Sequence, residues 1–154
     1  MDSLVPKPYI TADYASHNGM NGDNINDIYV DGGDRIWLAN YPAGVTIRNN
    51  RYQSYEWFRH SPGNSRSLVN DQVHDVIEDS EGDLWFATSN GISLLQPAVG
   101  RWRSFLSRSD GIQDGGNHIF LTLCEVSPGV ICAGGYASGL YRIEKKTGRV
   151  EYFP

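Results

Sequence analysis

The sequence predicts an all-β fold made of about three four-stranded antiparallel β-propeller blades, which together form an incomplete propeller. Three observations predict it. A motif recurs with a period in the high forties, short apolar runs alternate with turn residues, and no stretch shows a sustained helical period. A solenoid of paired helices has a similar period, but its sequence shows a 3.6-residue apolar repeat in place of strands.

The recurring motif is an acidic turn with glycine, followed by a tryptophan strand and a second glycine. It reads IYVDGGDRIWLANYPAGV over residues 28–45 and VIEDSEGDLWFATSNGI over residues 76–92. Trp85 follows Trp37 by 48 positions, and the alignment of this stretch needs no gap. A third and weaker copy aligns at an offset of 46, which places Ile131 at the tryptophan position. We interpret the motif as a hairpin of a repeated blade.

Each copy contains four short strands. In the clearest copy they are expected at residues 73–78, 84–88, 92–95 and 102–106. Apolar, β-branched and aromatic residues fill these runs, and Gly, Asp, Asn, Ser and Pro fill the gaps between them. Turns such as DSEGD and DGGDR place Gly or Asx where a tight hairpin needs a positive φ.

The chain as a whole, residues 1–154, is predicted to be a single partial propeller. The expected units are the last strand of a preceding blade at 7–14 and three blades at 20–58, 68–106 and 117–153. Propellers close with about four to eight blades, so the open ends should expose strand edges and apolar faces. We therefore expect a piece of a longer protein, or alternatively a unit that completes a ring with copies of itself.

Composition and charge exclude several functions. A chain of 154 residues with 40% hydrophobic content is an ordinary globular composition, and its formal charge of −5 disfavours a direct nucleic-acid partner. No apolar run approaches the length of a membrane span, so a membrane is expected only through a parent protein. The histidines lack metal-ligand spacing and there is no C-x-x-C, so we predict no metal, cofactor or catalytic residue.

Two sets of acids invite a catalytic interpretation. Asp79 and Asp83, with their counterparts Asp31 and Asp34, could form the carboxylate pair of a glycosidase. However, a catalytic pair is needed once, whereas a turn is needed in every blade, so we predict a structural role. Acids also recur in the first strands, where we favour hydrogen bonds to a neighbouring blade over a channel lining; these are Asp27 and Asp75.

The two cysteines, Cys124 and Cys132, flank the turn at residues 127–129 symmetrically. A three-residue loop would place them directly opposite each other, so a cross-strand disulfide is possible. Two free thiols buried in the blade core are the alternative, which we favour.

Ligand contacts are predicted at one end of the blades. In an up-and-down blade, the links between blades and the turns between second and third strands emerge together, and these segments vary in length here. Polar and aromatic side chains in them suit a polar, ring-shaped ligand such as a sugar. The candidates are Asn40, Tyr41, His60, Arg66, Asn90, Asn117, His118 and Tyr136.

The repeat resembles a known family. Its pattern of GLxNxxV, then an acidic turn before a Leu/Ile-Trp strand, then Asn-Gly-Ile/Leu is similar to the two-component regulator propeller repeat. This repeat is found in periplasmic sensor regions of bacterial hybrid histidine kinases. The best match is at residues 68–94, followed by 20–47, and 118–143 is weaker because it lacks the tryptophan and the DSEG turn.

The resemblance implies a periplasmic sensor of one or two large propellers, followed by a β-sandwich, a membrane helix, a kinase core and often a DNA-binding response regulator. Such sensors in gut Bacteroidetes commonly detect oligosaccharides and signal through a phosphorelay. The implied partner is thus an oligosaccharide or another small polar ligand, which biases the arrangement of a dimer. No phosphoacceptor or ATP-binding motif can be read here, so the segment itself should lack enzymatic activity.

Two other functions remain open. A self-assembling propeller lectin would form a compact oligomer with equivalent sugar sites. A fragment of a propeller lyase or glycosidase would need a catalytic cluster that occurs once, and the sequence shows none.

Overall fold

The computed structural model describes residues 19–110 and 117–154, within which the chain forms three four-stranded antiparallel sheets. Blade 1 comprises β1 (Ile25–Val30), β2 (Arg35–Asn40), β3 (Gly44–Asn49) and β4 (Ser54–Phe58). Blade 2 comprises β5 (Val73–Glu78), β6 (Leu84–Thr88), β7 (Gly91–Gln96) and β8 (Arg101–Phe105). The short 3-10 helix η1 (Arg108–Asp110) precedes blade 3, which comprises β9 (Phe120–Ser127), β10 (Val130–Gly135), β11 (Leu140–Glu144) and β12 (Val150–Phe153). The predicted all-β, incomplete propeller is confirmed, whereas the strand expected at 7–14 lies outside the described residues.

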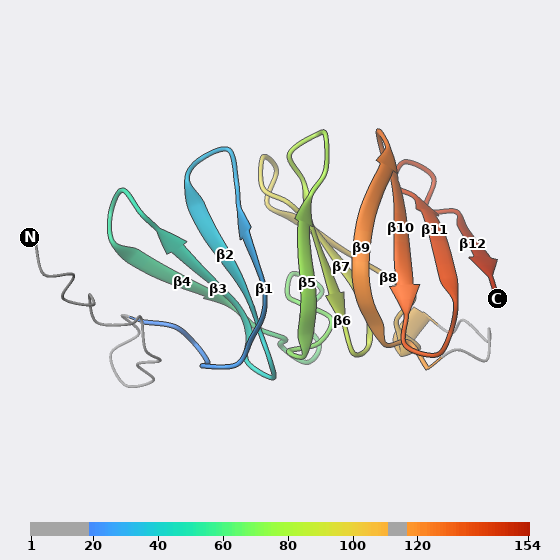
Figure 1. Ribbon diagram of the computed structural model, residues 1–154, viewed down its shortest axis with the longest axis horizontal. Coiled ribbons are helices and arrows are strands. Elements are labelled where there is room, and N and C mark those ends of the chain that lie inside the picture. Colours follow the sequence, from blue (N-terminus) through green and yellow to red (C-terminus); the bar gives the residue numbers. More distant parts are fainter. Residues whose placement is uncertain (1–18, 111–116) are drawn as a thin grey trace, which may run out of the picture.

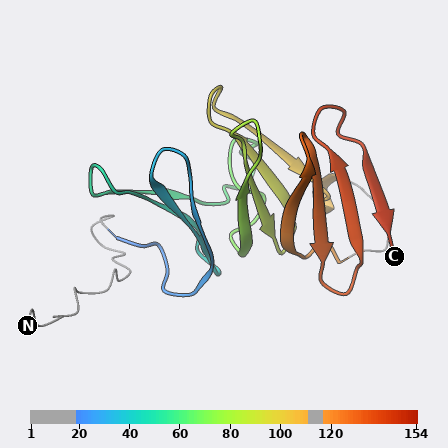
Figure 2. The ribbon, with the colours of Figure 1, turned by 45° about the horizontal axis from the view of Figure 1, so that its top comes forward.

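The three sheets stand side by side in the order of the chain, from blade 1 to blade 3 (Figure 1). Within each sheet, strands that follow one another in sequence are hydrogen-bonded neighbours. The first strands β1, β5 and β9 contact one another in order, while the fourth strands lie at the far side of each sheet. The tilted view shows the same succession of sheets from blade 1 to blade 3 (Figure 2).

Two apolar cores lie between the sheets. Trp37 of blade 1 packs in the first core, with its ring centroid 6.1 Å from that of Phe86 in blade 2. Trp85 occupies the same position in blade 2 and packs in the second core with Phe120 and Ile131 of blade 3. Each blade therefore buries its apolar side chains against its neighbours, which is the packing expected of a repeat that cannot form a core alone.

The second glycine of the motif has a steric role. Gly91 has a φ of +96°, and a Cβ atom there would lie 2.8 Å from the carbonyl oxygen of Phe105. Gly44 and Gly139 occupy the same position in the other blades and also have positive φ. Only a residue without a side chain fits where the third and fourth strands of a blade come this close, which explains why the glycine recurs.

The register of blade 3 corrects the sequence alignment. Cys132 pairs with Cys124 as Trp85 pairs with Ile77, so the offset between blades is 47 here and Cys132 occupies the tryptophan position. The prediction that Ile131 occupies it is wrong by one residue. Because side chains alternate along a strand, this shift moves them to the opposite face of the sheet. Ile131 consequently faces blade 2, and Cys132 faces away from it.

The turn between β9 and β10 is also tighter than predicted. Ser127 pairs with Val130, which leaves a two-residue turn, and a bulge at Val126 restores the pairing of Cys124 with Cys132. The predicted opposition of the two cysteines is correct, but by way of a shorter turn and a bulge.

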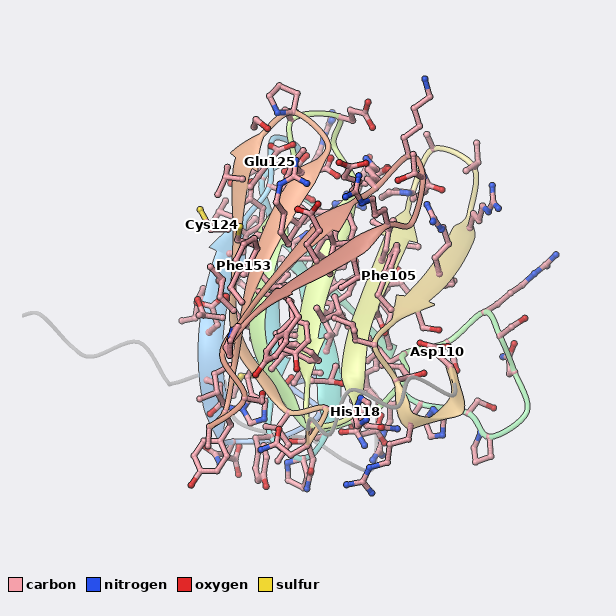
Figure 3. All side chains as sticks on the ribbon, turned by 90° about the vertical axis from the view of Figure 1, so that its right-hand side faces the viewer. Phe105, Asp110, His118, Cys124, Glu125 and Phe153 are labelled. Atoms are coloured by element: carbon pink, nitrogen blue, oxygen red, sulfur yellow. The ribbon has the colours of Figure 1, made fainter. Side chains whose placement is uncertain are left out.

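Both cysteines are free thiols, and neither lies in a core. Cys124 is exposed and Cys132 is partly exposed, so the expectation of two buried thiols is wrong. The reason is their register, which turns both side chains toward the open face of blade 3. Figure 3 shows the Cys124 sulfur at the outer surface of the stack.

The two end faces of the stack expose apolar side chains, as expected of an incomplete propeller. On blade 1, Ile28 is 60% and Val30 is 53% exposed. On the far face of blade 3, Leu140 is 43% and Phe153 is 47% exposed. The equivalents of Leu140 and Phe153 in blade 2 are core residues, so these are positions that a neighbouring sheet would cover.

Candidate functional site

The loops gather at two opposite ends of the stack. The end that is uppermost in Figure 1, which we call the turn end, holds the hairpin turns between first and second strands and between third and fourth strands. The linker end holds the remaining loops and the links between blades. Figure 3 shows Glu125 near the turn end and Asp110 and His118 at the linker end.

The acids of the turn end build the hairpins. Asp79 accepts hydrogen bonds from two backbone amides of its own turn and from the Trp85 indole at 2.8 Å. Asp31 makes the same set of bonds to its turn and to Trp37, also at 2.8 Å. Burial disfavours the charge of Asp79, but the hydrogen bonds from Lys145, Trp85 and the amides outweigh it and lower the pKa of the carboxyl. The predicted structural role of these two acids is confirmed.

The second acid of each turn, Asp83 or Asp34, has a different environment. Asp83 accepts a hydrogen bond from Gln96 at 2.8 Å and pairs with Lys145 at 2.7 Å. Asp34 takes a turn position with a φ of 59°, a conformation in which Asx residues are well tolerated. These two acids likewise serve the turns and their surroundings.

The acids of the first strands connect the blades. Asp27 accepts a hydrogen bond from the Val76 amide of blade 2 at 3.0 Å, and Asp75 accepts one from the Leu123 amide of blade 3 at 2.6 Å. Burial and the neighbouring Asp27 raise the pKa of Asp75. The favoured prediction, a bond to the next blade's backbone, is therefore confirmed.

Asn40, one of the predicted ligand residues, has a structural role. Its side chain is 0% exposed; its amide nitrogen donates to Gly22 at 3.2 Å and its oxygen accepts from the Thr46 hydroxyl at 2.7 Å. Both ends of the amide are thus satisfied internally. Asn40 shapes the loop of blade 1 and is not open to a ligand in this structure.

Tyr41 belongs to a small polar cluster near the first strands. Its ring lies 5.6 Å from the His74 ring, and His74 Nε2 lies 2.8 Å from the Ser89 hydroxyl. Asn26 Nδ2 lies 3.4 Å from His74 Nδ1, which therefore accepts. Burial lowers the pKa of His74, so its imidazole is neutral at pH 7. His74 was not among the predicted site residues, because it lies on a strand whereas the prediction considered loops.

Four of the predicted residues surround the link between blades 2 and 3. Asn117 donates to the Tyr136 carbonyl, and the Tyr136 amide donates to the link at Ile119 O, 2.8 Å away. The His118 carbonyl oxygen accepts a hydrogen bond from the Gly91 amide. The side-chain oxygen of the adjacent Asn90 accepts one from the Arg108 amide at 3.2 Å. Asn90, Asn117, His118 and Tyr136 thus lie along one stretch of the linker end. The central part of this link, residues 111–116, lies outside the described residues.

His60 lines a groove of about 650 Å³ between the link from blade 1 to blade 2 and strand β8. We call it the linker groove; it is lined by His60, Ser61, Pro62, Gly63, Asn64, Ser65, Ser67, Val69, Trp102, Arg103 and Ser104. His60 Nδ1 lies 2.8 Å from the Leu68 carbonyl oxygen, so Nδ1 donates this hydrogen bond. Arg66 lies outside this groove and lines a smaller one beside it.

Trp102 is the aromatic side chain of the linker groove. It packs edge-on against Phe58 at 5.3 Å and stacks with Phe86 at 6.0 Å, so its ring is held in place from behind. Sequence reasoning did not select it, since it lies on the outer strand and outside the variable loops. The signal that could have found it is the tryptophan between two arginines in RWRSF. Blade 1 has Tyr55 at the equivalent position.

The described residues hold neither a cluster of metal ligands nor a membrane-spanning helix. Across residues 19–110 and 117–154, no three His, Cys, Asp or Glu side chains gather closely enough to hold a metal ion. The same part of the chain contains no helix that is long and apolar enough to cross a membrane.

Comparison with known proteins finds a family match within one of the blades. Residues 67–90, which run from the link before blade 2 through β5 and β6, match the sequence profile of the two component regulator propeller family. Residues 67–90 are similar to a two-component regulator propeller repeat. The resemblance drawn from the sequence is thereby confirmed for its best copy. No curated protein matches the sequence.

Solved structures share the fold of this propeller repeat and its neighbours. The extracellular domain of BT3049 from B. thetaiotaomicron, described as a hybrid two component system, aligns with a TM-score of 0.80, 22% identity and 95% of this chain, but 20% of its own. The extracellular domain of BT4673 from the same organism gives a TM-score of 0.69, 21% identity, 92% of this chain and 18% of its own.

A third similar structure has a different context. PorZ, a surface component of the type-IX secretion system of Porphyromonas gingivalis, aligns with a TM-score of 0.62, 11% identity, 86% of this chain and 21% of its own. At these identities the likeness shows the fold alone. The chain spans about a fifth of the length of the solved structures that it matches.

Proposed function

We propose that this chain is part of an extracytoplasmic, ligand-sensing propeller of a hybrid two-component system. The propeller repeat at residues 67–90 supports this proposal, as does the fold shared with extracellular domains that are described as belonging to such systems. In this proposal the chain recognises a ligand outside the cytoplasm, and the kinase chemistry belongs to other parts of the parent protein.

The observation that carries the site is the linker groove with Trp102. A fixed aromatic ring offers the apolar face on which a sugar ring stacks. Around it lie His60, Asn64 and Ser104, whose side chains can form hydrogen bonds with hydroxyl groups. This combination suits a neutral oligosaccharide, and the link that forms one wall also joins two blades.

The same groove supports a binding role over a catalytic one. Its lining contains no Asp or Glu side chain within the described residues, whereas glycoside hydrolysis uses a pair of carboxylates. The acids of the hairpin turn in blade 2, Asp79 and Asp83, lie at the turn end and hold backbone amides, Trp85 and Lys145. The chain accordingly acts as a binding segment.

Ligand binding would reach the rest of the parent protein through the packing of blades. A ligand shifts an equilibrium only by the difference in its affinity for the two arrangements. The link that lines the groove is bonded to both blades: the Asp71 carbonyl accepts from Gly44 of blade 1 at 2.7 Å, and the Val69 amide donates to Ser93 of blade 2 at 2.9 Å. A ligand that prefers one position of this link would thereby bias the arrangement of a sensor dimer.

The test is a calorimetric titration of the chain with short linear oligosaccharides of glucose, mannose, galactose and xylose. We expect at least one to bind, and His60→Ala or Trp102→Leu to weaken it by about tenfold through the lost hydrogen bond or stacking surface. Tyr52→Ala, a change of an exposed aromatic at the turn end, is the matched control and should bind as the unaltered chain does. Binding that survives both groove changes would reject the linker groove as the site.

A self-assembling sugar-binding module is the second candidate, and the exposed apolar end faces favour it. Copies that stack end to end would cover Ile28 of one chain and Phe153 of the next. Such a module would show several equivalent sugar sites in a compact oligomer, whereas a sensor segment would show one site per chain with no oligomer of fixed size.

A further inference from the structure

A second groove lies at the turn end, between blades 2 and 3. Its volume is about 510 Å³, and its walls come from the end of β7, the start of β8 and the turns of blade 3 at residues 128–129 and 145–147. Four cationic side chains line it: Arg101, Arg103, Lys145 and Lys146. We call it the cationic groove.

One of the four cations is fully compensated. The Lys145 ammonium group is buried and lies 2.7 Å from Asp79, 2.6 Å from Glu81 and 2.7 Å from Asp83. These three carboxylates of blade 2 account for its charge and raise its pKa against the effect of burial. Lys145 therefore fastens blade 3 to blade 2 and leaves no charge for a ligand.

The other three cations have no such partners. In the described part of the chain, Arg101, Arg103 and Lys146 form no ion pair with a carboxylate. The groove contains two carboxylates, but Glu81 is paired with Lys145 at 2.6 Å and Glu144 with Arg142, outside the groove, at 3.0 Å. Among the described residues, three cations of the groove thus lack a carboxylate partner, while the carboxylates around Lys145 exceed its charge by two.

Arg103 is held in place for a ligand. One guanidinium nitrogen donates to the Lys145 carbonyl at 2.8 Å, and the group lies 4.9 Å over the Phe105 ring. Burial and the repulsion of Arg101 lower the pKa of Arg103. A fixed guanidinium fork with free donors matches the geometry of an oxyanion.

The other blades lack two of these cations, whereas Arg101 recurs as Arg149 in blade 3. The position of Arg103, two residues before the phenylalanine that ends the fourth strand, is Glu56 in blade 1 and Glu151 in blade 3. The turn position of Lys146 is Ala98 in blade 2. Features that build a blade recur in this chain, whereas this cluster of cations occurs at one interface.

We propose that the cationic groove binds a tetrahedral oxyanion, a sulfate or phosphate group carried by a small ligand, with Arg103, Arg101 and Lys146 as its contacts. Two guanidinium groups and one ammonium group around a partly enclosed space give such a group both charge and hydrogen-bond donors. The site shares Arg103 with the linker groove, but it does not depend on the sensing role proposed above.

The test is an NMR titration of the chain with sodium sulfate and, separately, sodium phosphate, with sodium chloride holding the ionic strength constant. We expect saturable shifts of the amides of Arg103, Gly129 and Lys146, and weakening by about tenfold in Arg103→Gln and in Lys146→Gln. Lys146 is exposed, so its variant keeps the fold even if Arg103→Gln does not. Methyl sulfate and methyl phosphate then distinguish the two sources of the group, because the tighter ester identifies the ligand class.

Arg149→Gln is the matched control, since it removes the same charge from an exposed arginine that is paired with Glu151. It should leave the affinity within about twofold. The proposal is overturned if the shifts do not saturate, if Arg149→Gln weakens binding as much as Arg103→Gln, or if sodium acetate binds as tightly as sulfate. The first two results would indicate general charge screening, and the third a site without preference for a tetrahedral group.

Discussion

Aspartate residues of this chain show how one side chain serves two structural tasks. Asp31 and Asp79 close hairpin turns and hold an indole, whereas Asp27 and Asp75 reach across to a backbone amide of the next blade. The first task benefits from the negative charge, because the hydrogen bonds lower the pKa of these carboxyls. The second task needs an acceptor only, and at Asp75 the charge is a disadvantage.

We predict that Asp75→Asn is at least as stable as the unaltered chain at pH 7, while Asp75→Ala is less stable by about 1–3 kcal/mol. Asparagine keeps an acceptor for the Leu123 amide, and alanine leaves that amide unpaired. The folded-state pKa of Asp75 is raised above the unfolded value of 3.8, so the folded state holds the proton more tightly. The contribution of this group to stability is therefore largest at low pH and decreases as the pH rises from the unfolded toward the folded pKa.

Urea unfolding over a pH series measures this effect as the difference between the unaltered chain and Asp75→Asn. That difference should shift in favour of the asparagine variant as the pH rises above 3.8. A difference that does not change with pH would show that Asp75 is not strained by its charge.

At the scale of the strand and turn, steric contact between backbone segments decides where glycine is required. Gly91 and Gly63 both have positive φ, but a Cβ atom at Gly91 would meet the backbone of Phe105 and Ser107, whereas one at Gly63 meets nothing within 4 Å. Comparing the two positions therefore separates the free-energy cost of the left-handed conformation from that of the close backbone approach.

We predict that Gly91→Ala destabilises the chain by more than about 3 kcal/mol, because both strain and overlap act there. Gly63→Ala should cost about 1 kcal/mol, the typical penalty of a left-handed conformation alone. Thermal unfolding followed by circular dichroism compares the two. Equal losses in melting temperature would show that the approach of the strands is not tight.

The cysteine pair of β9 and β10 gives another prediction at this scale. Directly opposed residues of antiparallel strands have Cα separations of about 4.5 or 5.5 Å, and both values suit a disulfide. Mild oxidation should therefore join Cys124 to Cys132 within one chain, although both are free thiols in the structure. A thiol assay and a non-reducing gel test this: loss of both thiols without dimer supports it, and disulfide-linked dimers contradict it.

The sequence was sufficient for the elements of blade 2 and insufficient for the register of blade 3. Strands expected at 73–78 and 84–88 are β5 and β6 as observed, because turn residues and glycine mark their ends. In blade 3 the offset of 46 failed by one residue, because this copy lacks the tryptophan and the acidic turn that fix the alignment of the other two blades.

The residues of the candidate site were likewise predictable from the sequence only in part. Loop residues such as His60 could be selected from the variable segments, and the structure places His60 in the linker groove. Trp102 and His74 could not, since each lies on a strand and meets the loops only through the folding of a neighbouring blade. Burial separated Asn40 from the other candidates, and local sequence carries no sign of that burial.

At the scale of the whole molecule, the middle blade holds the stack together. Blade 2 contributes one face to each of the two cores, while blades 1 and 3 contribute one face to a single core. In such an array stability comes largely from the interfaces between neighbouring units. The two outer faces, with Ile28 and Phe153 exposed, remain available for contact.

We predict that the chain associates as its concentration rises and that Phe153→Asp reduces this association. Phe153 lies on the open face of blade 3, where burying it against another sheet would remove apolar surface from water. Tyr52→Asp introduces the same charge at an exposed aromatic on the β3–β4 turn and should have no such effect. Sedimentation velocity measures it, and equal behaviour of both variants would locate the contact elsewhere.

The bonds between first strands also limit how often one blade can be copied. Asp27 and Asp75 succeed each other along the inner edge of the stack, and the second already has a raised pKa because of burial and the first. In blade 3 the register places Thr122 at this position, and its hydroxyl stabilises the Asp75 carboxylate by a hydrogen bond. An array of identical blades would carry a column of crowded anions along its inner edge, so a designer who lengthens this stack should alternate the aspartate with a neutral hydroxyl residue.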